Sequence, residues 1–426
     1  MLRCCLLLFV LGLASPGRAF AQTITTCADS WAEIADAISA AGANAGHHDV
    51  RIVQGTYVMN GSILAQLHPD AFLSLRGGYN PGCASRTLDP TNTTLAGQSV
   101  HALRIRHNRD FTLEGVTIRN LGGYLQSLDG GIGIVCTATD GNVRHVALRH
   151  NIFSEIDGKY AGVDVYGDGP CRLAFRNNLV KAMTAPAAAS FFRAVSLCSG
   201  LFDGTRQGEY ADQNTFVGIS AGGGSNSSAL GVCKTGMVAH NLFHNNTPRD
   251  IDMLPGNAMN VVGNLYDQMP SDGIGGQNVG NFSADPLFVN PGLGDYRLQL
   301  ASPAINQGAT LTDLTQDLAG NGRQIGSRTD LGAYESNLND LTQVLVTNSA
   351  DSGAGSLRQA LLDANANPNH TLVRFSMPGV CGSQGILLLS ALPDISTAVT
   401  IDGYTQSAAQ PNTSSSAFNA QVCVGL

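Results

Sequence analysis

Charged side chains are scarce in this chain of 426 residues, and so are tryptophan, which occurs once, and the helix-forming residues lysine and glutamate. Charged residues make up 13% of the chain, about half the share usual in globular proteins. The 24 basic residues are outnumbered by 32 acidic ones, so the net charge is −8, which disfavours a nucleic-acid partner. Glycine is abundant instead, at 50 residues, and apolar residues make up 43%. This composition predicts a glycine-rich β protein and disfavours disorder along the whole chain.

The chain has one long apolar run, and this run lies at the N-terminus. Arg3 precedes apolar residues 4–13, and Ala19-Phe20-Ala21 provides a small-x-small cleavage site. The run is too short to cross a bilayer, which takes about twenty apolar residues. It predicts a signal peptide over residues 1–21 and therefore an exported protein, outside the cell or on its outer surface. No later segment is apolar enough for a transmembrane helix.

The cysteines include no CxxC pair, the spacing typical of zinc sites, so no metal is expected. Ten cysteines minus the two in the signal peptide leave eight, and an even number in an exported chain favours disulfides. Two pairs share a spacing of 35 residues and are predicted as equivalent bridges, Cys136–Cys171 and Cys198–Cys233. Cys27–Cys83 and Cys381–Cys423 are predicted as the other two.

An asparagine followed by two mostly apolar residues recurs down the middle of the chain. Successive copies are 27, 36, 27 and 23 residues apart, and the two cysteine pairs repeat at 62 residues, close to the 63 that separate alternate asparagines. Helical repeats are disfavoured because no helical periodicity is sustained, and the leucine-rich repeat core is missing. The copies begin at Asn151, Asn178, Asn214, Asn241 and Asn264.

Short runs in this part of the chain have a larger apolar residue at every second position, as in Leu103–Arg106 and Val146–Arg149. A period of two residues is typical of a β-strand. Coils of two or three such strands predict an all-β fold, a right-handed parallel β-helix solenoid. The repeated asparagine then has two interpretations: a buried amide ladder between coils, or a turn that tolerates positive φ.

The pattern changes at both ends of the repeat. Asp29 or Ser30 can cap a helix over residues 31–40, which we expect to cover the N-terminal end of the solenoid. The apolar stripe expected on this helix consists of Trp31, Ile34, Ala35 and Ile38. Two strands are expected after the helix, at residues 50–53 and 71–75. The same order restarts near the C-terminus, with a helix over 357–364 capped by Ser356 and strands at 372–375 and 398–402.

Five parts are therefore predicted along the chain. They are the signal peptide (1–21), the N-terminal cap with the first coils (22–97), further β-helix coils (98–280), a closing segment (281–340) and the start of a second, similar and incomplete module (341–426).

The closing segment contains four short blocks in order: Asn281 to Phe288, Gly294 to Leu298, Ser302 to Ile305, and Asp330-Leu-Gly-Ala-Tyr-Glu335. It resembles the closing segment of the choice-of-anchor Q proteins, exported bacterial β-helix proteins of pectin-lyase-like architecture. The stretch from Val346 to Ala360 looks like the start of β-helix regions in large bacterial surface proteins. The resemblance implies the fold and an exported setting, but it implies no single activity.

Catalysis needs motifs that the sequence lacks. A lyase needs Ca²⁺ or arginine to neutralise a uronate and a base to remove the neighbouring proton, but the Arg-x-Pro-x-x-Arg pattern of pectate lyases is missing. The Asn-Thr-Asp, Asp-Asp and Gly-His-Gly blocks of polygalacturonases are missing too. No cofactor is therefore expected, and Ca²⁺ would be needed only by a lyase.

Weaker candidates come from one acidic strand and one acidic pair. If residues 163–168 form a strand, Asp164, Tyr166 and Asp168 share its outer face. Asp250 and Asp252 would lie about 6.6 Å apart along a strand, near the spacing of an inverting carboxylate pair. The alternative is a solvated strand face.

Ligand contacts are predicted for Tyr160, Tyr166 and Arg193, with Lys159 beside them. His150, His240 and His244 lie beside the repeating asparagine, where a turn or a satisfied partner is favoured over catalysis or metal binding. The sequence thus predicts a secreted or cell-surface β-helix protein that binds polysaccharide or mediates adhesion. The alternative is a polysaccharide lyase or glycoside hydrolase of the same fold.

Overall fold

The computed structural model of the protein divides the chain into two compact units, Met1–Glu335 and Ser336–Leu426. The predicted signal peptide lies outside the described residues. The structure describes residues 22–122, 130–137, 140–167, 171–186, 189–199, 209–222, 224, 227–233, 236–253, 259–267, 276–299, 302–309, 314–325, 328–336, 342–366, 371–379, 381, 384–397, 399–410 and 420–425.

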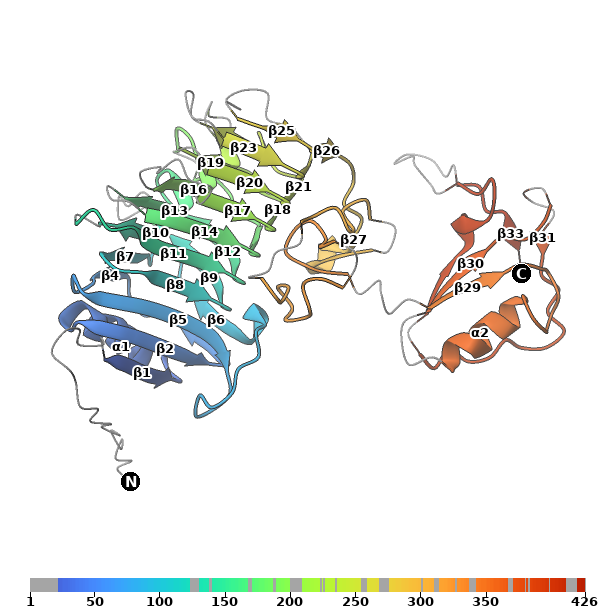
Figure 1. Ribbon diagram of the computed structural model, residues 1–426, viewed down its shortest axis with the longest axis horizontal. Helices are drawn as coiled ribbons and strands as arrows, with labels where there is room; N and C mark the ends of the chain where they lie inside the picture. The colour runs from blue at the N-terminus through green and yellow to red at the C-terminus, as the bar shows by residue number, and fades with distance from the viewer. Residues whose placement is uncertain are drawn as a thin grey trace. The chain divides into compact units, whose positions relative to one another are not determined.

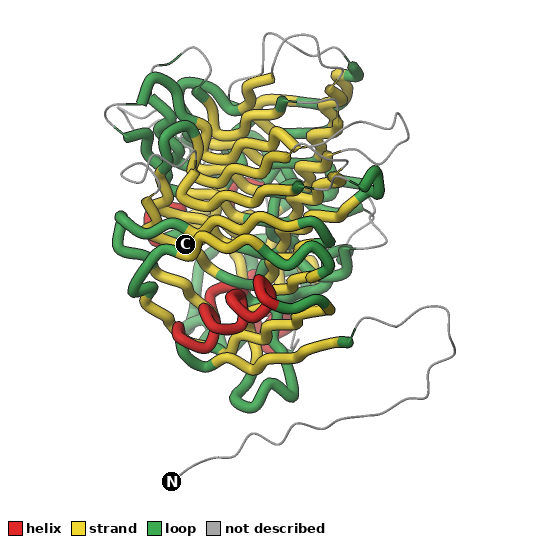
Figure 2. Tube along the Cα trace, turned by 90° about the vertical axis from the view of Figure 1, so that its left-hand side faces the viewer, coloured by secondary structure: helices red, strands yellow, loops and turns green. Residues whose placement is uncertain are grey.

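The first unit is a parallel β-helix, so the predicted all-β solenoid is confirmed (Figure 1). From β2 to β24 the strands enter three sheets in turn, named A, B and C here, and each strand pairs in parallel with the equivalent strand of the next coil. Figure 2 shows the strands of successive coils running side by side.

Sheet A contains β1 (Thr23–Ala28), β2 (Gly46–Val53), β5 (Ala71–Tyr79), β8 (Phe111–Glu114), β11 (Arg144–Arg149), β14 (Cys171–Arg176), β17 (Glu209–Asp212), β20 (Gly236–Ala239), β23 (Met259–Val262) and β25 (Asn278–Val279). Sheet B contains β3 (Gly55–Val58), β6 (Thr93–Ala96), β9 (Thr117–Gly122), β12 (Ile152–Asp157), β15 (Leu179–Lys181), β18 (Thr215–Val217), β21 (Leu242–His244), β24 (Leu265–Tyr266) and β26 (Phe282–Ser283). Sheet C contains β4 (Ile63–Gln66), β7 (Leu103–His107), β10 (Gly130–Cys136), β13 (Ala161–Gly167), β16 (Arg193–Ser199), β19 (Ser228–Val232) and β22 (Ile251–Met253).

Large apolar side chains fill the inside of the coils, because alternate residues of each strand point inward. Aromatic rings stack from coil to coil along this core, with centroids 4.8 Å apart for Phe216 and Phe243 and 5.5 Å apart for Phe243 and Tyr266. All three side chains are fully buried. The alternation therefore leaves only the outer faces of the sheets for function.

The repeating asparagines form a buried ladder between sheets A and B. Asn214 Nδ2 donates to Asn241 Oδ1 at 2.9 Å, and the same oxygen accepts the backbone N–H of Asn214 at 2.9 Å. Equivalent bonds join Asn151 to Asn178, Asn178 to Asn214, Asn241 to Asn264 and Asn264 to Asn281. The ladder interpretation is thus confirmed. The positive φ of the turn belongs to the residue before each asparagine, such as His150 or Gln213.

Helix α1 (Trp31–Ala43) lies at the N-terminal end of the stack in both views (Figures 1 and 2). Ser30 caps it by accepting the backbone N–H of Glu33 at 3.3 Å. The predicted stripe is partly wrong: Ala37 and Ala41 are buried with Ile34 and Ile38, whereas Ala35 is only half-buried. The buried residues follow the i, i+3, i+4, i+7 spacing of one helix face, and Ala41 lies beyond the predicted end of the helix.

Described residues between Ala284 and Glu335 pack on the outer face of sheet B. A hairpin of β27 (Phe288–Asn290) and β28 (Asp295–Leu298) places Phe288 and Leu298 against Leu179, Leu242 and Leu265. Leu331 and Ala333 join the same apolar cluster. This segment therefore covers a row of leucines that would otherwise face solvent.

The second unit repeats the order of elements found at the start of the first. Strand β29 (Thr342–Val346) is followed by helix α2 (Leu357–Asn365), capped by Ser356, and then by β30 (Thr371–Phe375) and β32 (Val399–Asp402) in one parallel sheet. β31 (Gln384–Gly385) pairs in parallel with β33 (Val424–Gly425). Short 3₁₀ turns occupy η1 (Pro90–Asn92), η3 (Pro291–Leu293) and η5 (Gly403–Thr405).

The cysteines form the four predicted pairs, Cys27–Cys83, Cys136–Cys171, Cys198–Cys233 and Cys381–Cys423. The two pairs with equal spacing are not equivalent in position. Cys136 joins the end of β10 to the start of β14, whereas Cys198 joins β16 to the residue after β19, its neighbour in sheet C. Equal spacing therefore identified the partners but not the elements they link.

Candidate site on the outer face of sheet C

Polar side chains line up on the outer face of sheet C because parallel strands keep register from coil to coil. Asp164 of β13 lies beside Ser196 of β16, Ser196 beside Gly231 of β19, and Gly231 beside Asp252 of β22. Tyr166 lies two residues further along β13, on the same face. The structure thus places three of the predicted residues on one surface.

The predicted ligand residue Arg193 lies across Gly231 and reaches Asp252. Arg193 Nη2 is 2.6 Å from Asp252 Oδ2, and the two side chains are only 9% and 7% exposed. A Cβ on Gly231 would lie 1.9 Å from Arg193 Cδ, so glycine keeps this path open. Arg249 Nη1 lies 3.5 Å from the other carboxylate oxygen. Asp252 is therefore held between two guanidinium groups.

A second arginine crosses sheet C in the same way. Arg104 of β7 runs over Gly133 of β10, where a Cβ would lie 3.3 Å from Arg104 Cγ. Its guanidinium donates to the Tyr166 hydroxyl, and Arg104 Cζ is 5.6 Å from the centre of the tyrosine ring. Cation–π contact and hydrogen bond together fix the orientation of Tyr166.

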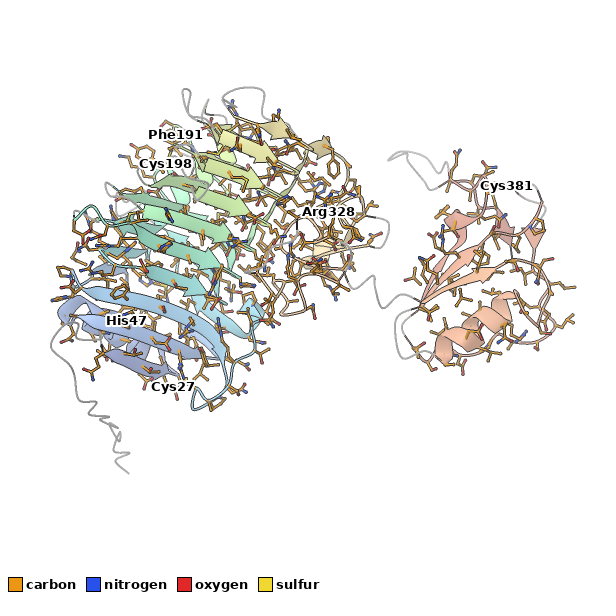
Figure 3. All side chains as sticks on the ribbon, in the orientation of Figure 1. Cys27, His47, Phe191, Cys198, Arg328 and Cys381 are labelled. Atoms are coloured by element: carbon orange, nitrogen blue, oxygen red, sulfur yellow. A yellow bond between two sulfur atoms is a disulfide. The ribbon has the colours of Figure 1, made fainter. Side chains whose placement is uncertain are left out.

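Two aromatic rings stack where the chain enters β13 and β16. The rings of Tyr160 and Phe191 are 5.0 Å apart and inclined by 15°, and both side chains are half-buried. Lys159 Nζ lies 4.7 Å from the centre of the Tyr160 ring, and Arg193 Cζ lies 5.5 Å from that of Phe191. Figure 3 labels Phe191 beside these strands, several coils from His47. The face thus offers a ring pair with a cation at each ring.

The predicted carboxylates are not arranged as a pair of free acids. Asp250 is fully buried, and its oxygens accept from Asn246 Nδ2 at 2.9 Å and the backbone N–H of Asp267 at 3.1 Å. Asp164 and Asp252 are separated by three strand spacings, about 14 Å, beyond the roughly 5–9.5 Å that glycosidases use. Asp168 lies outside the described residues.

The three histidines beside the ladder have partners in the fold. His150 Nε2 is 2.9 Å from the Gln316 carbonyl oxygen, His240 Nδ1 is 3.1 Å from Asp212 Oδ1, and His244 Nδ1 is 3.2 Å from Asp267 Oδ1. Burial lowers the pKa of His150 to about 4. These contacts match the turn and partner roles expected for them.

Sequence reasoning missed Phe191, Arg104 and a charged row on sheet A. Two consecutive phenylalanines directly before Arg193 were the signal that could have pointed to Phe191. The row places one charged residue beside the next in six successive coils and ends at Asp212, which lies beside Ala239. Its last three members stand two residues before a ladder asparagine, and that fixed offset was a readable signal. Its members pair mainly with one another or with near neighbours, so the row stabilises the stack. They are Arg51, Arg76, Glu114, Arg149, Arg176 and Asp212.

Within the described ranges, no group of three or more histidine, cysteine, aspartate or glutamate side chains is placed to hold a metal ion. No helix in the same part of the chain is long and apolar enough to cross a membrane. No protein-family model and no curated protein matches the sequence. The outer face of sheet C, with its ring pair and two crossing arginines, therefore provides the chemistry on which a function can be argued.

Proposed function

We propose that the protein is an exported β-helix protein that binds a polysaccharide along the outer face of sheet C without cleaving it. The observation that supports this best is the stacked pair of Tyr160 and Phe191 with Lys159 and Arg193 at its rings. Aromatic rings pack against the apolar faces of sugars. The Lys159 ammonium favours chains that bear carboxylates, whereas Arg193 is paired with Asp252 and holds its place beside the Phe191 ring. A long solenoid face suits an extended ligand.

The setting of the proposal is extracellular. Four disulfides fit an oxidising compartment, and the signal peptide over residues 1–21 supplies the route. We further propose membership of the choice-of-anchor Q group on the four blocks between Asn281 and Glu335, and a second β-helix module that begins near residue 341. In support, the last block packs closely on sheet B, where Ala333 donates to Thr215 Oγ1 at 2.9 Å.

Replacing Phe191 by alanine tests the proposed surface. Loss of one stacked ring removes roughly 1–1.5 kcal/mol of binding free energy, a five- to tenfold weaker Kd for an acidic polysaccharide. Phe72→Ala is the matched control, because Phe72 is a half-buried ring stacked on His47 at 4.1 Å on the outer face of sheet A. Binding is measured by calorimetry against a panel of acidic and neutral polysaccharides. Equal weakening in both variants, or no binding at all, would rule out this surface.

The same panel decides between binding and catalysis. New reducing ends or unsaturated products would replace the proposal with a hydrolase or a lyase. Binding without turnover supports it, because Asp250 is buried and Asp252 is ion-paired to Arg193.

A further inference from the structure

The short strands of sheet B present two rows of side chains on their outer face. In β15, β18 and β21 the first and third residues point outward and the second points into the core. The first row is apolar apart from Thr215 and is covered by described residues between Ala284 and Glu335. The second row runs along the margin of this cover and consists of Ser154, Lys181, Val217 and His244, with Asp267 bonded to His244 at its end.

Two aromatic rings of the β27–β28 hairpin lie over this second row. Phe288 and Tyr296 pack edge to face with centroids 5.3 Å apart. Lys181 Nζ is 5.6 Å from the centre of the Tyr296 ring, and the His244 ring is 5.7 Å from that of Phe288. Lys181 and His244 are two strands apart, about 10 Å. The ring pair therefore lies between a cation and a histidine.

Of these two groups, Lys181 is the one left to recognise a charged ligand. His244 is bonded at both ring nitrogens, to Asp267 at 3.2 Å and to Asn245 at 3.0 Å. Lys181 is half-buried, and no carboxylate in the described ranges pairs with it. Burial lowers the pKa of Lys181, and Glu155 opposes this only through space. A partly desolvated ammonium without a counter-ion favours an anion beside it.

The choice of lysine here is unusual for this chain. Only three lysines, at 159, 181 and 234, stand among 24 basic residues. Arginine supplies the cation of the ion pairs along the coils, as with Glu114, Asp212 and Asp252. Lys181 lies over a tyrosine ring, as Lys159 does. The compact ammonium of a lysine beside a half-buried ring suits a reversible ligand better than a bidentate structural pair.

We infer that Lys181 and Tyr296 form a second ligand site, which binds a uronate: the Lys181 ammonium pairs with the carboxylate and the Tyr296 ring packs against the sugar. The site lies on sheet B and goes beyond the proposed surface on sheet C, since neither shares a residue with the other. Gly294 lies beside Lys181 Nζ, in the left-handed region at φ 80° that favours glycine.

Acetylation of lysine side chains tests the Lys181 site and the sheet C surface, through Lys159, in one experiment on the full chain. The protein is treated with an acetylating reagent, with and without trigalacturonate, and modification of each lysine is followed by mass spectrometry of peptides. Bound uronate should slow acetylation of Lys181 at least about threefold, because the paired ammonium is held protonated. Maltotriose, which has no carboxylate, should leave the rate unchanged. Protection by both sugars, or by neither, would overturn the inference.

Lys159 separates this result from the fate of the sheet C proposal. Protection of Lys159 alone would overturn the Lys181 site and leave the proposed sheet C surface standing. Protection of Lys181 alone would overturn the sheet C surface and support the Lys181 site. Lys181→Gln should weaken trigalacturonate binding at this site about tenfold, the worth of one charge-assisted bond, and Lys181→Arg should restore part of it. Arg297→Gln is the control, because Arg297 lies on the same hairpin and pairs with Asp295 at 2.6 Å. Equal loss in the Gln variants would contradict the assignment.

Discussion

At the scale of single residues, the ladder shows why asparagine occupies one place in each coil. Asn214 is fully buried, and its amide donates to the Phe175 carbonyl oxygen at 2.8 Å and to Asn241 at 2.9 Å. Its oxygen accepts from the backbone and side chain of Asn178. Aspartate lacks the donors and serine lacks the reach, so only asparagine satisfies every partner in a dry turn.

Replacing Asn214 by alanine should therefore destabilise the solenoid strongly. The change removes the side-chain donor to the Phe175 carbonyl and leaves the backbone N–H and Nδ2 of Asn178 without their acceptor in the interior, at a cost of at least about 3 kcal/mol. Asn281→Ala is the matched control, because Asn281 ends the ladder and is only half-buried. Urea unfolding followed by circular dichroism measures both. A loss for Asn214→Ala no larger than that for Asn281→Ala would show that the ladder contributes little.

The sequence predicted where the repeating asparagine occurs in each coil better than it predicted what the asparagine does. From the sequence, the asparagine could equally form a buried ladder or a turn with positive φ, because each asparagine follows a polar or glycine residue, as in His150-Asn151 and Gln213-Asn214. The structure uses both neighbours, the first for the turn and the second for the ladder. For Asp250 and Asp252 the spacing along a strand was readable. Their neutralisation was not, because Asn246 and Arg193 come from other turns and coils.

At the scale of elements, Arg323 fastens the closing segment to the coils. Its Nε donates to Gln213 Oε1 at 3.1 Å and its Nη2 to the Asp330 carbonyl oxygen at 3.1 Å. Glu335 lies 3.9 Å from Nη1 and accepts the backbone N–H of Asp330 at 3.0 Å. The block Asp330–Glu335 thus owes its sequence to docking. The residues of this block could be recognised in the sequence. The role of Gln213 as a partner of Arg323 could not, because Gln213 lies about 110 positions earlier in the chain.

Arg323→Met should release the closing segment without unfolding the coils. Loss of the guanidinium leaves Gln213, two carbonyls and the buried Glu335 carboxyl without their partner, a cost of about 3–5 kcal/mol. Hydrogen exchange should rise at least tenfold in residues 281–335 and stay unchanged in β5 and β8. Arg328→Met is the control, because Arg328 is exposed in the same segment (Figure 3). Unchanged exchange in Arg323→Met would mean that the apolar contacts suffice.

At the scale of the whole molecule, stability depends on neighbouring coils, because each coil buries its strands only against the next. Two neutral histidines are enclosed in this stack. His107 is fully buried at the end of β7, where its Nδ1 lies 2.6 Å from the Arg109 carbonyl oxygen, and burial lowers its pKa from 6.5 to about 4. Burial has the same effect on His150. The pKa of Glu335 shifts in the opposite direction, because burial raises it to about 7.

Acid should therefore weaken the solenoid before most carboxylates titrate. A histidine whose pKa is lower in the folded chain than in the unfolded chain adds stability that is present above pH 6.5 and is lost as the pH falls through about 4. The loss amounts to roughly 3 kcal/mol for each histidine. Glu335 gains stability over part of the same range, so the comparison is made between wild type and His107→Gln, in which its effect cancels. Urea midpoints between pH 7 and pH 4.5 should fall less steeply in His107→Gln. Parallel curves would mean that His107 takes up its proton in the fold at its ordinary pKa.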